Sequence, residues 1–332
     1  MVYVLRLKAF LIGLALISMV FGAANALAAD PHILLRVDVA DLVGSRAAAA
    51  RDEIRTLLRD AQPRISYSGL AASDRAVQVR IDDASQVEAA KSALKTLTDP
   101  VAGIQEMALD DSEPGLLKFT VTDAGVKSRM SVALKQSIEV IKNRLHDLGI
   151  SGAVAQRTDE DGILVDAPGV TDLQSLGKTL TRPGRLSFQL VDTSMPVNDA
   201  INGRPPVGSS VLYTIDDPPV PYLVENRVLV SGEHVLDANA THEALAGQPV
   251  VAFRLDSRGT ERFGWATRQY VGKPFAVILD DQVISAPIIR EPITGNTGQI
   301  WGNFTDVEAK TIAMLFRTGA LPARLTIVEE AR

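Results

Sequence analysis

The chain has 332 residues, long enough for about two domains of the usual ~100–200 residues. Its formal net charge of −6 argues against a nucleic-acid partner, because phosphate binding needs a basic surface. It has no cysteine, which excludes disulfides, thiolate nucleophiles and cysteine-based zinc sites.

The first thirty residues have the layout of an export signal. Arg6 and Lys8 precede a long apolar run, and the Ala-Leu-Ala at 26–28 matches a cleavage site, so residues 1–28 are predicted to be a signal peptide. The alternative is a retained N-terminal membrane anchor, because residues 9–29 carry no charge and are just long enough to cross a bilayer. Both interpretations place the folded part outside the cytoplasm, and the second adds membrane contact through the N-terminus.

Hydrophobic periodicity predicts two similar units in the first 192 residues. Residues 32–97 follow the order strand, helix, strand, strand, helix, and residues 116–192 repeat it with one further strand. The longest helix is expected from Asp123, because apolar residues recur every three or four positions as far as Leu148. Both orders match the split βαβ pattern of ferredoxin-like folds.

The remaining residues have a different pattern. Residues 193–222 are rich in proline and are predicted to be a mobile loop. Strands are expected at 227–230 and 250–255, a helix at 257–270, and a hairpin from Phe275 whose turn includes Asp280-Asp281. Capping boxes of the S/T-x-x-E/Q type are predicted at Ser85–Glu88, Thr171–Gln174 and Thr305–Glu308. The last of these begins a helix and strand that resemble the end of the preceding unit.

This order predicts an α+β protein with two parts. Residues 29–192 and 299–332 would form a ferredoxin-like, pseudo-symmetric base, and residues 193–298 an inserted β-rich α+β head domain. The chain would cross between them twice, and a double crossing is a natural hinge. The candidate hinge residues are Asp192, Thr193, Gly298 and Gln299.

Catalytic motifs are missing from the sequence. It contains no nucleophile elbow, P-loop, dinucleotide fingerprint or HExxH motif, so we predict no enzyme and no cofactor. His234 and His242 lie near carboxylates, but their spacing does not suit metal ligation, and no metal site is predicted. Asp280-Asp281 could be paired acids, although adjacent carboxylates in a turn more often serve the turn itself.

Four aromatic residues are candidates for contact with an extended peptide. They are Phe253, Phe263, Trp265 and Phe275, which could line an apolar groove. The competing interpretation is that they form the small core of the head, which is the commoner role of such side chains.

Several segments resemble the periplasmic region of SecD, the accessory subunit of the bacterial protein translocase. The similarity runs in order from about Ile33 to Glu330. The segments that carry it include Leu255-Asp256-Ser257-Arg258-Gly259, Val283-Ile284-Ser285-Ala286-Pro287, Gly302-Asn303-Phe304-Thr305, Phe188-Gln189-Leu190-Val191-Asp192 and Gly319-Ala320-Leu321-Pro322-Ala323.

The resemblance implies a base with an inserted head that holds emerging, unfolded preprotein and swings relative to the base. It also implies translocase membrane subunits as partners. The family's later membrane helices and its Asp-Leu-Arg/Lys-Gly-Gly element are not matched here, so this chain is expected to be unable to conduct protons alone. A free periplasmic binding or assembly protein remains the alternative, and a hydrolase is disfavoured because no nucleophile and base are paired.

Overall fold

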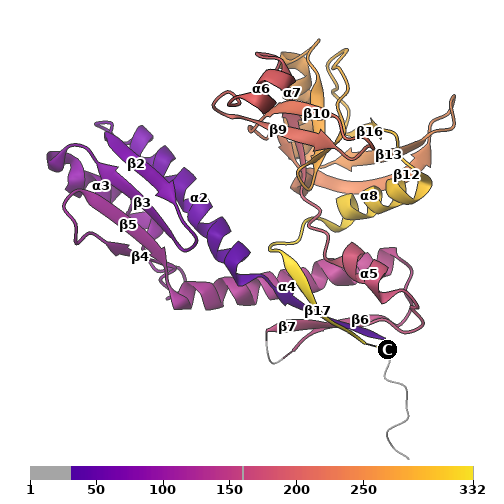
Figure 1. Ribbon diagram of the computed structural model, residues 1–332, viewed down its shortest axis with the longest axis horizontal. Coiled ribbons are helices and arrows are strands. Elements are labelled where there is room, and N and C mark those ends of the chain that lie inside the picture. The colour runs from indigo at the N-terminus through magenta and orange to yellow at the C-terminus, as the bar shows by residue number, and fades with distance from the viewer. Residues whose placement is uncertain (1–30, 159–160, 332) are drawn as a thin grey trace, which may run out of the picture.

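A computed structural model describes residues 31–158 and 161–331. The predicted signal peptide or anchor at residues 1–28 lies outside this part of the chain. The described residues form four β-sheets distributed over three bodies, which we call the base, the distal unit and the head (Figure 1). No helix among these residues combines the length and apolar character that a membrane crossing requires.

The base is a four-stranded antiparallel sheet with two helices on one face. Its strands lie in the order β17 (Leu325–Ala331), β1 (His32–Val37), β7 (Gly162–Asp166) and β6 (Val154–Arg157). The helices are α4 (Asp123–Asp147) and α5 (Leu173–Leu180). Alternate residues of β1, including Ile33 and Leu35, are fully buried against Leu134 and Ile141 of α4. Counted along the chain, the strand order is that of a ferredoxin-like sheet, so the predicted fold class is confirmed.

The distal unit is a second four-stranded antiparallel sheet covered by helices. Its strand order is β2 (Tyr67–Ala72), β3 (Ala76–Ile81), β5 (Leu116–Val121) and β4 (Met107–Asp110). The helices are α2 (Val39–Asp60) and the short α3 (Val87–Ala93). Ile54 and Leu58 of α2 are fully buried in its core together with Val77 and Leu117 of the sheet.

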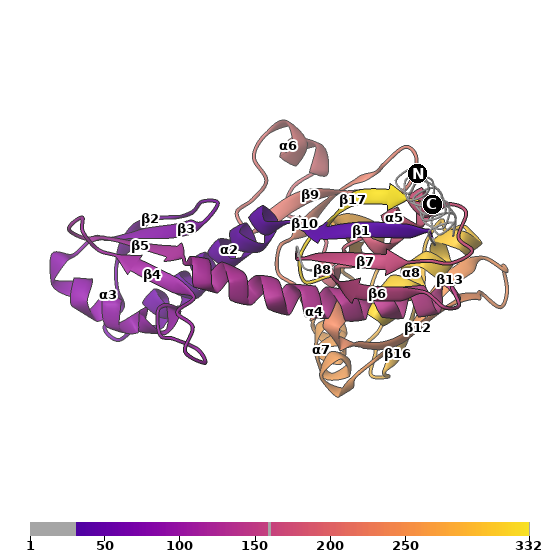
Figure 2. The ribbon, with the colours of Figure 1, turned by 90° about the horizontal axis from the view of Figure 1, so that it is seen from below.

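The two repeats seen in the sequence exchange their first strands. Strand β1 lies in the base sheet, yet the helix that follows it, α2, packs on the distal sheet. Strand β5 lies in the distal sheet, and α4 carries the chain from it back to the base. The two long helices contact each other as they cross between the bodies (Figures 1 and 2). The element order of each repeat is as predicted, but each of the two sheets combines strands from both repeats.

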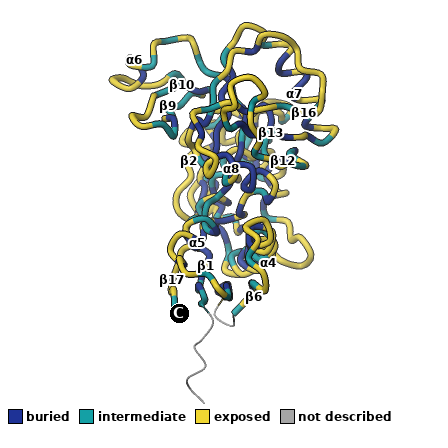
Figure 3. The backbone as a smooth tube through the Cα atoms, turned by 90° about the vertical axis from the view of Figure 1, so that its right-hand side faces the viewer, coloured by how far each residue is buried: buried dark blue, intermediate teal, exposed yellow. Residues whose placement is uncertain are grey.

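The head contains a six-stranded and a three-stranded sheet. The six strands are β10 (Pro221–Glu225), β9 (Ser209–Thr214), β15 (Gln282–Ser285), β14 (Phe275–Leu279), β8 (Leu186–Leu190) and β11 (Val230–Ser231), in that order. The three are β12 (Val235–His242), β13 (Pro249–Leu255) and β16 (Thr297–Trp301). The helices are α6 (Val197–Asn202), α7 (Ser257–Gln269) and α8 (Asp306–Thr318). Figure 3 shows buried residues concentrated where α8 meets the sheets.

Two segments predicted for the base lie in the head. Strand β8 pairs with β14 along its whole length, because Leu186, Phe188 and Leu190 are buried in the head core. Helix α8 packs on the three-stranded sheet, and strand β16 pairs with β13. The fourth base strand is β17 instead. We therefore propose that the head begins after α5 rather than at residue 193.

Candidate functional site

Four phenylalanines form the centre of the head. Phe188, Phe253, Phe263 and Phe275 come from β8, β13, α7 and β14, and their ring centroids lie 5.6–6.2 Å apart. All four side chains are buried. Three of the four predicted peptide-contact residues therefore meet in this cluster. The fourth, Trp265, is 46% exposed and lies outside it.

A cleft of about 290 Å³ opens beside the phenylalanine cluster. Its lining combines the four buried rings with side chains that are open to solvent. Ile288 is 61% exposed and Trp301 is 48% exposed, and both line the cleft. Exposed apolar side chains around an apolar cavity are typical of a binding groove, because they pay a solvation penalty until they are covered. Sequence reasoning identified three of the four rings as candidates, but not Phe188, Ile288 or Trp301.

The segment 286–293 closes one side of the cleft and is tied to the head by backbone hydrogen bonds. The Phe275 amide donates to Pro287 O at 2.8 Å, and the Ile289 amide donates to Lys273 O at 3.0 Å. The Ile293 amide donates to Thr267 Oγ1 at 2.9 Å, which joins the segment to α7. The wall of the cleft is therefore held in place before any occupant arrives.

The position of Phe253 depends on a glycine in β16. A Cβ atom at Gly298 would meet Phe253 Cζ at 2.5 Å, closer than real Cβ contacts allow. The ring therefore lies against the backbone of the neighbouring strand, where any side chain at residue 298 would displace it.

The candidate hinge residues Gly298 and Gln299 are paired with Phe253 and Ala252 inside the three-stranded sheet. They line the cleft and do not lie at a crossing between head and base.

The chain crosses between base and head at residues 181–185 and 319–324, and Arg144 of α4 joins the two crossings. This side chain is fully buried. Its Nη1 donates to Leu180 O at 2.8 Å and Arg182 O at 2.5 Å, and its Nη2 donates to Gly319 O at 3.1 Å. Burial lowers the pKa of Arg144 to about 10, so the guanidinium stays charged at neutral pH. A Cβ at Gly184 would lie 2.9 Å from Nη2, so the adjacent glycine leaves room for the guanidinium.

The hairpin turn of the head reaches the same junction. Asp280 and Asp281 have φ values of 53° and 63°, as a tight hairpin turn requires, so their interpretation as turn residues is confirmed. The Arg185 amide donates to Asp280 Oδ1 at 2.8 Å, and Arg182 Nε lies 3.5 Å from Asp280 Oδ2. The Asp280 carboxylate thereby holds the first crossing segment against the six-stranded sheet.

A third contact fixes the far end of α4 to the head. Arg317 of α8 donates from Nε and Nη2 to Asp147 Oδ2 at 2.9 and 2.8 Å, and from Nη1 to the carbonyl of Ala238 in β12. This contact joins the base helix α4 to the head.

The remaining candidate hinge residues, Asp192 and Thr193, follow β8 within the head. Asp192 accepts hydrogen bonds there from Ser194 N and Ser209 Oγ.

Sequence reasoning missed Arg144, although a signal was present. Ile141, Arg144, Leu145 and Leu148 have the spacing of one helix face, so Arg144 interrupts an apolar stripe. A charged residue in such a position is either at the edge of the stripe or buried with several hydrogen-bond partners.

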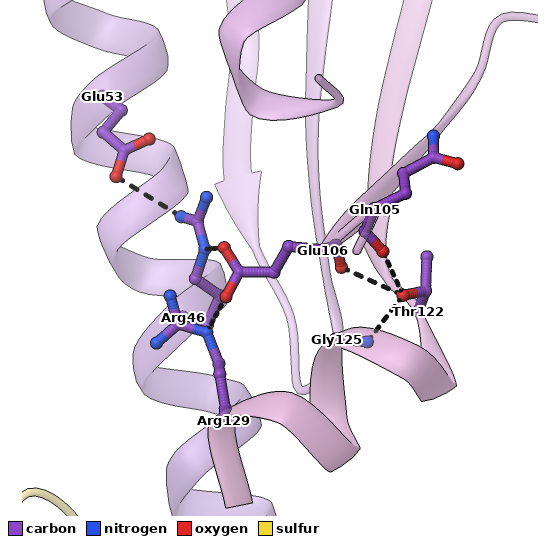
Figure 4. A network of polar contacts seen from close by, with 7 residues as sticks. All are labelled: Arg46, Glu53, Gln105, Glu106, Thr122, Gly125 and Arg129. Atoms are coloured by element: carbon purple, nitrogen blue, oxygen red, sulfur yellow. Dashed lines mark hydrogen bonds and ion pairs between the residues drawn. The ribbon is translucent and has the colours of Figure 1, made fainter. Parts of the chain in front are cut away.

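A second joint connects α2 and α4 near the distal unit (Figure 4). Glu106 accepts from buried Arg46 Nε at 2.9 Å and from Arg129 Nε. Burial alone would raise the pKa of Glu106, but the hydrogen bonds and charges of Arg129 and Arg46 outweigh it and hold that pKa below its usual value. Thr122 caps α4 beside this joint by accepting from Gly125 N at 2.9 Å.

The two histidines considered as metal ligands have separate partners. His234 is buried and its Nδ1 lies 3.2 Å from Asp256 Oδ2, whereas His242 pairs with Asp306 at 2.9 Å. Residues 31–158 and 161–331 include no group of three or more acidic or histidine side chains placed to hold a metal ion.

Comparison with known proteins gives two matching family models. The model described as "SecDF, P1 head subdomain" matches residues 209–323. The model described as "Protein translocase subunit SecDF, P1 domain, N-terminal" matches residues 134–193. Together the two models cover more than half of the chain. The first includes every residue that lines the cleft except Phe188, which the second model matches.

Full-length relatives are similar over a wider range. Protein translocase subunit SecDF of Brucella abortus is 35% identical over 256 residues, which are 77% of this chain and 33% of the relative. Protein translocase subunit SecD of Acetobacter pasteurianus is 31% identical over 302 residues, 90% of this chain and 56% of the relative. A crystal structure of SecDF in the super-membrane-facing form is 27% identical with a TM-score of 0.50, covering 60% of this chain and 28% of that chain. The matched part of the chain thus spans from 28% to 56% of the length of these relatives.

Proposed function

The chain belongs to the SecD family of protein translocase subunits, and on this basis we propose that it assists protein export by holding unfolded preprotein in the head cleft. The role is non-enzymatic and is exerted on the periplasmic side of the membrane, beside the translocase membrane subunits. The observation that carries the proposal is the cleft of about 290 Å³. It is lined by buried phenylalanine rings together with the exposed side chains of Ile288 and Trp301. Its volume suits one or two apolar side chains of an extended chain.

The proposed contact residues follow from burial. Phe253, Phe263 and Phe275 would form the floor that receives an apolar side chain, and the exposed Ile288 and Trp301 would cover its flanks. A cleft that recognises apolar character and not sequence suits a partner that must accept many different preproteins.

We further propose that the head moves about the two crossing segments, residues 181–185 and 319–324. These segments are short and contain Gly184 and Gly319, whose positive φ values of 76° and 77° are glycine conformations. Motion here would carry the cleft as one body, because the segment at 286–293 is bonded to α7 and β14 within the head.

Photo-crosslinking tests the cleft directly. A photoreactive amino acid at Ile288 is expected to crosslink a preprotein stalled during export. The same amino acid at Leu245, an exposed apolar residue in the loop between β12 and β13, should give none. Ile288→Asp should reduce the capture of stalled preprotein, and Leu245→Asp should not. Crosslinks from Ile288 to folded envelope proteins alone would contradict the proposal and favour a free periplasmic assembly protein.

A further inference from the structure

Helix α7 presents a basic face to solvent. One side of the helix packs Phe263, Ala266 and Thr267 into the head, where all three are buried. On the other side Arg258, Arg262, Trp265 and Arg268 are exposed and follow one another at intervals of four, three and three residues, which aligns them in one stripe. The only acidic residue in the helix sequence is Glu261. Helix α7 lies at the periphery of the head (Figures 1 and 2).

Trp265 is held in an exposed position by two neighbours. The Tyr270 ring meets it edge-on, with centroids 6.1 Å apart and an interplanar angle of 86°. The guanidinium carbon of Arg227, from the segment between β10 and β11, lies 5.8 Å from the centre of the Trp265 ring. The contact with Trp265 adds the Arg227 guanidinium to the four side chains of the stripe. It also holds the indole ring in a fixed orientation at the surface. We call Arg227, Arg258, Arg262, Trp265 and Arg268 the Trp–Arg surface.

The arginines of this surface outnumber the one acidic residue among them, Glu261, which is exposed on the same face of α7. Within the described residues, no ion pair is formed by Arg227, Arg258, Arg262 or Arg268, whereas Arg46, Arg129 and Arg317 all have carboxylate partners. The whole chain carries a net charge of −6, so four arginines beside a single glutamate are a local excess of positive charge. Such a surface attracts an anionic partner, and guanidinium groups bind carboxylates in a bidentate manner.

We propose that the Trp–Arg surface binds acidic segments of an unfolded polypeptide. The inference rests on the proposed function and extends it by naming a class of preprotein segment, acidic ones, that the head would bind. Its location supports a polypeptide, because Phe263 and Thr267 on the inner side of α7 line the cleft. A chain leaving the cleft around this helix would meet the Trp–Arg surface next. An anionic membrane is disfavoured because α7 already buries its apolar side in the head, and an interfacial helix needs that side for the bilayer.

Binding of labelled peptides to the purified full chain tests this proposal. The probes are an unstructured peptide of glutamate, glycine and serine, a neutral apolar peptide of equal length, and phosphatidylglycerol vesicles. Arg258→Glu with Arg262→Glu is expected to weaken binding of the acidic peptide about tenfold, by loss of attraction and gain of repulsion. Trp265→Ala should weaken it several-fold. The control pair Arg64→Glu with Lys310→Glu makes the same charge change at exposed sites elsewhere and should leave binding within about twofold.

The outcomes separate the two proposals. Binding of the apolar peptide should be unchanged by the α7 substitutions and reduced by Ile288→Asp. If the chain binds the apolar peptide but not the acidic one, the Trp–Arg proposal is overturned and the cleft proposal stands. The Trp–Arg proposal is also overturned if the control pair loses as much acidic-peptide binding as Arg258→Glu with Arg262→Glu. The same holds if those two substitutions weaken only the binding of vesicles and not that of the acidic peptide. Since all substituted side chains are exposed, unchanged urea unfolding confirms that each variant is folded.

Discussion

Arg144 places a cation between the carbonyl ends of two helices. Its guanidinium is fully buried and donates hydrogen bonds to Leu180 O at the end of α5 and Gly319 O after the end of α8. Both helix ends carry partial negative charge, which offsets the cost of burying the cation. One side chain of the base thereby satisfies backbone groups of both crossing segments.

Arg144→Met is expected to destabilise the protein by about 3 kcal/mol. The substitution keeps an apolar stem but leaves buried carbonyls without donors, at about 1–3 kcal/mol for such groups. Urea unfolding measures the loss, and proteolysis within residues 181–185 should become faster. Arg64→Met, at an exposed arginine, is the control and should change the free energy of unfolding by less than about 0.5 kcal/mol. Equal stability of the two variants would contradict the assigned role of Arg144.

Single caps illustrate how far residue patterns predict local structure. The capping box at Thr305 and Glu308 is present in both directions, as predicted. The box predicted at Ser85 is wrong, because Asp83 accepts from Ser85 N and starts the turn two residues earlier. Near Thr171, the side chain of Asp172 caps α5 by accepting from Ser175 N. Adjacent Ser, Thr and Asp compete for the same amides, and geometry rather than sequence decides between them.

The length of helices α2 and α4 indicates that the two repeats exchange their first strands. Helices α2 and α4 have 22 and 25 residues and so span about 33 and 37 Å, whereas a six-residue strand spans about 20 Å. Helices of this length reach beyond their own sheet. Periodicity predicted the elements correctly but could not assign partners, because any strand with alternating apolar residues fits either sheet. The same ambiguity let β8 be assigned to the base together with the C-terminal strand, although only β17 pairs there.

The proline-rich segment was predicted as a loop but contains α6, β9 and β10. Proline removes an amide donor, yet Pro221 begins β10, at the edge of the six-stranded sheet, where it is tolerated. For the cleft, the sequence identified aromatic residues but could not separate a core from a groove. That distinction depends on the position of the loop at 286–293, which is set by long-range hydrogen bonds.

Gly298→Ala should distort the cleft without unfolding the head. The new methyl group would push the Phe253 ring off β16 and into the cleft, at a cost of about 1–3 kcal/mol for overpacking. Calorimetry should show the lower stability, and apolar peptide binding should fall. Gly295→Ala is the matched control, because a Cβ atom at Gly295 has no neighbour within 4 Å and should be tolerated. Unchanged peptide binding by Gly298→Ala would contradict the role of the Phe253 ring in the cleft.

The joint between α2 and α4 should give the protein an acid-sensitive element. Because Glu106 has a lowered pKa when folded, its contribution is present above the unfolded value of 4.5 and is lost as the pH falls through the folded pKa. Glu106→Gln should cost about 2 kcal/mol at pH 7, since it leaves Arg46 buried beside a neutral amide. The free energy of unfolding of the Glu106→Gln variant should therefore depend less on pH below about 5 than that of the unmodified protein.

Urea unfolding across pH 3–7 measures this difference. Glu113→Gln removes the partner of Arg80 from an exposed ion pair and serves as the control. It should have little effect at any pH, because exposed pairs contribute little. If Glu106→Gln and the unmodified protein lose stability in parallel on acidification, the Glu106 joint is not the acid-sensitive element.

At the scale of the whole molecule, three bodies are connected by two kinds of joint. The distal unit is attached by α2 and α4 with the Glu106 ion pairs between them. The head is attached by two crossings, by Arg144 and by the pair Arg317–Asp147. The cleft and the Trp–Arg surface both belong to the head, so any head movement carries them together.

Asp147→Asn should loosen the head relative to the base while each remains folded. The substitution removes the charge of Asp147, whose Oδ2 accepts from both Nε and Nη2 of Arg317, and leaves the Arg144 junction intact. Spin labels on cysteines introduced at Leu245 in the head and Val154 in the base would report the change, because the chain has no cysteine of its own. The distance distribution should broaden. Asp52→Asn, which removes an exposed ion pair within α2, should leave it unchanged.

The pairing of β1 with β17 also determines when the protein can finish folding. His32 pairs with Ala331, so the base sheet closes only once residues 325–331 are present, whereas residues 39–121 contain every strand of the distal unit. Contacts of such long sequence separation form late. A chain delivered N-terminus first would therefore expose an unpaired edge of β1 until β17 emerges, and open edges invite aggregation. During its own delivery, this protein would need the same protection that it is proposed to give to others.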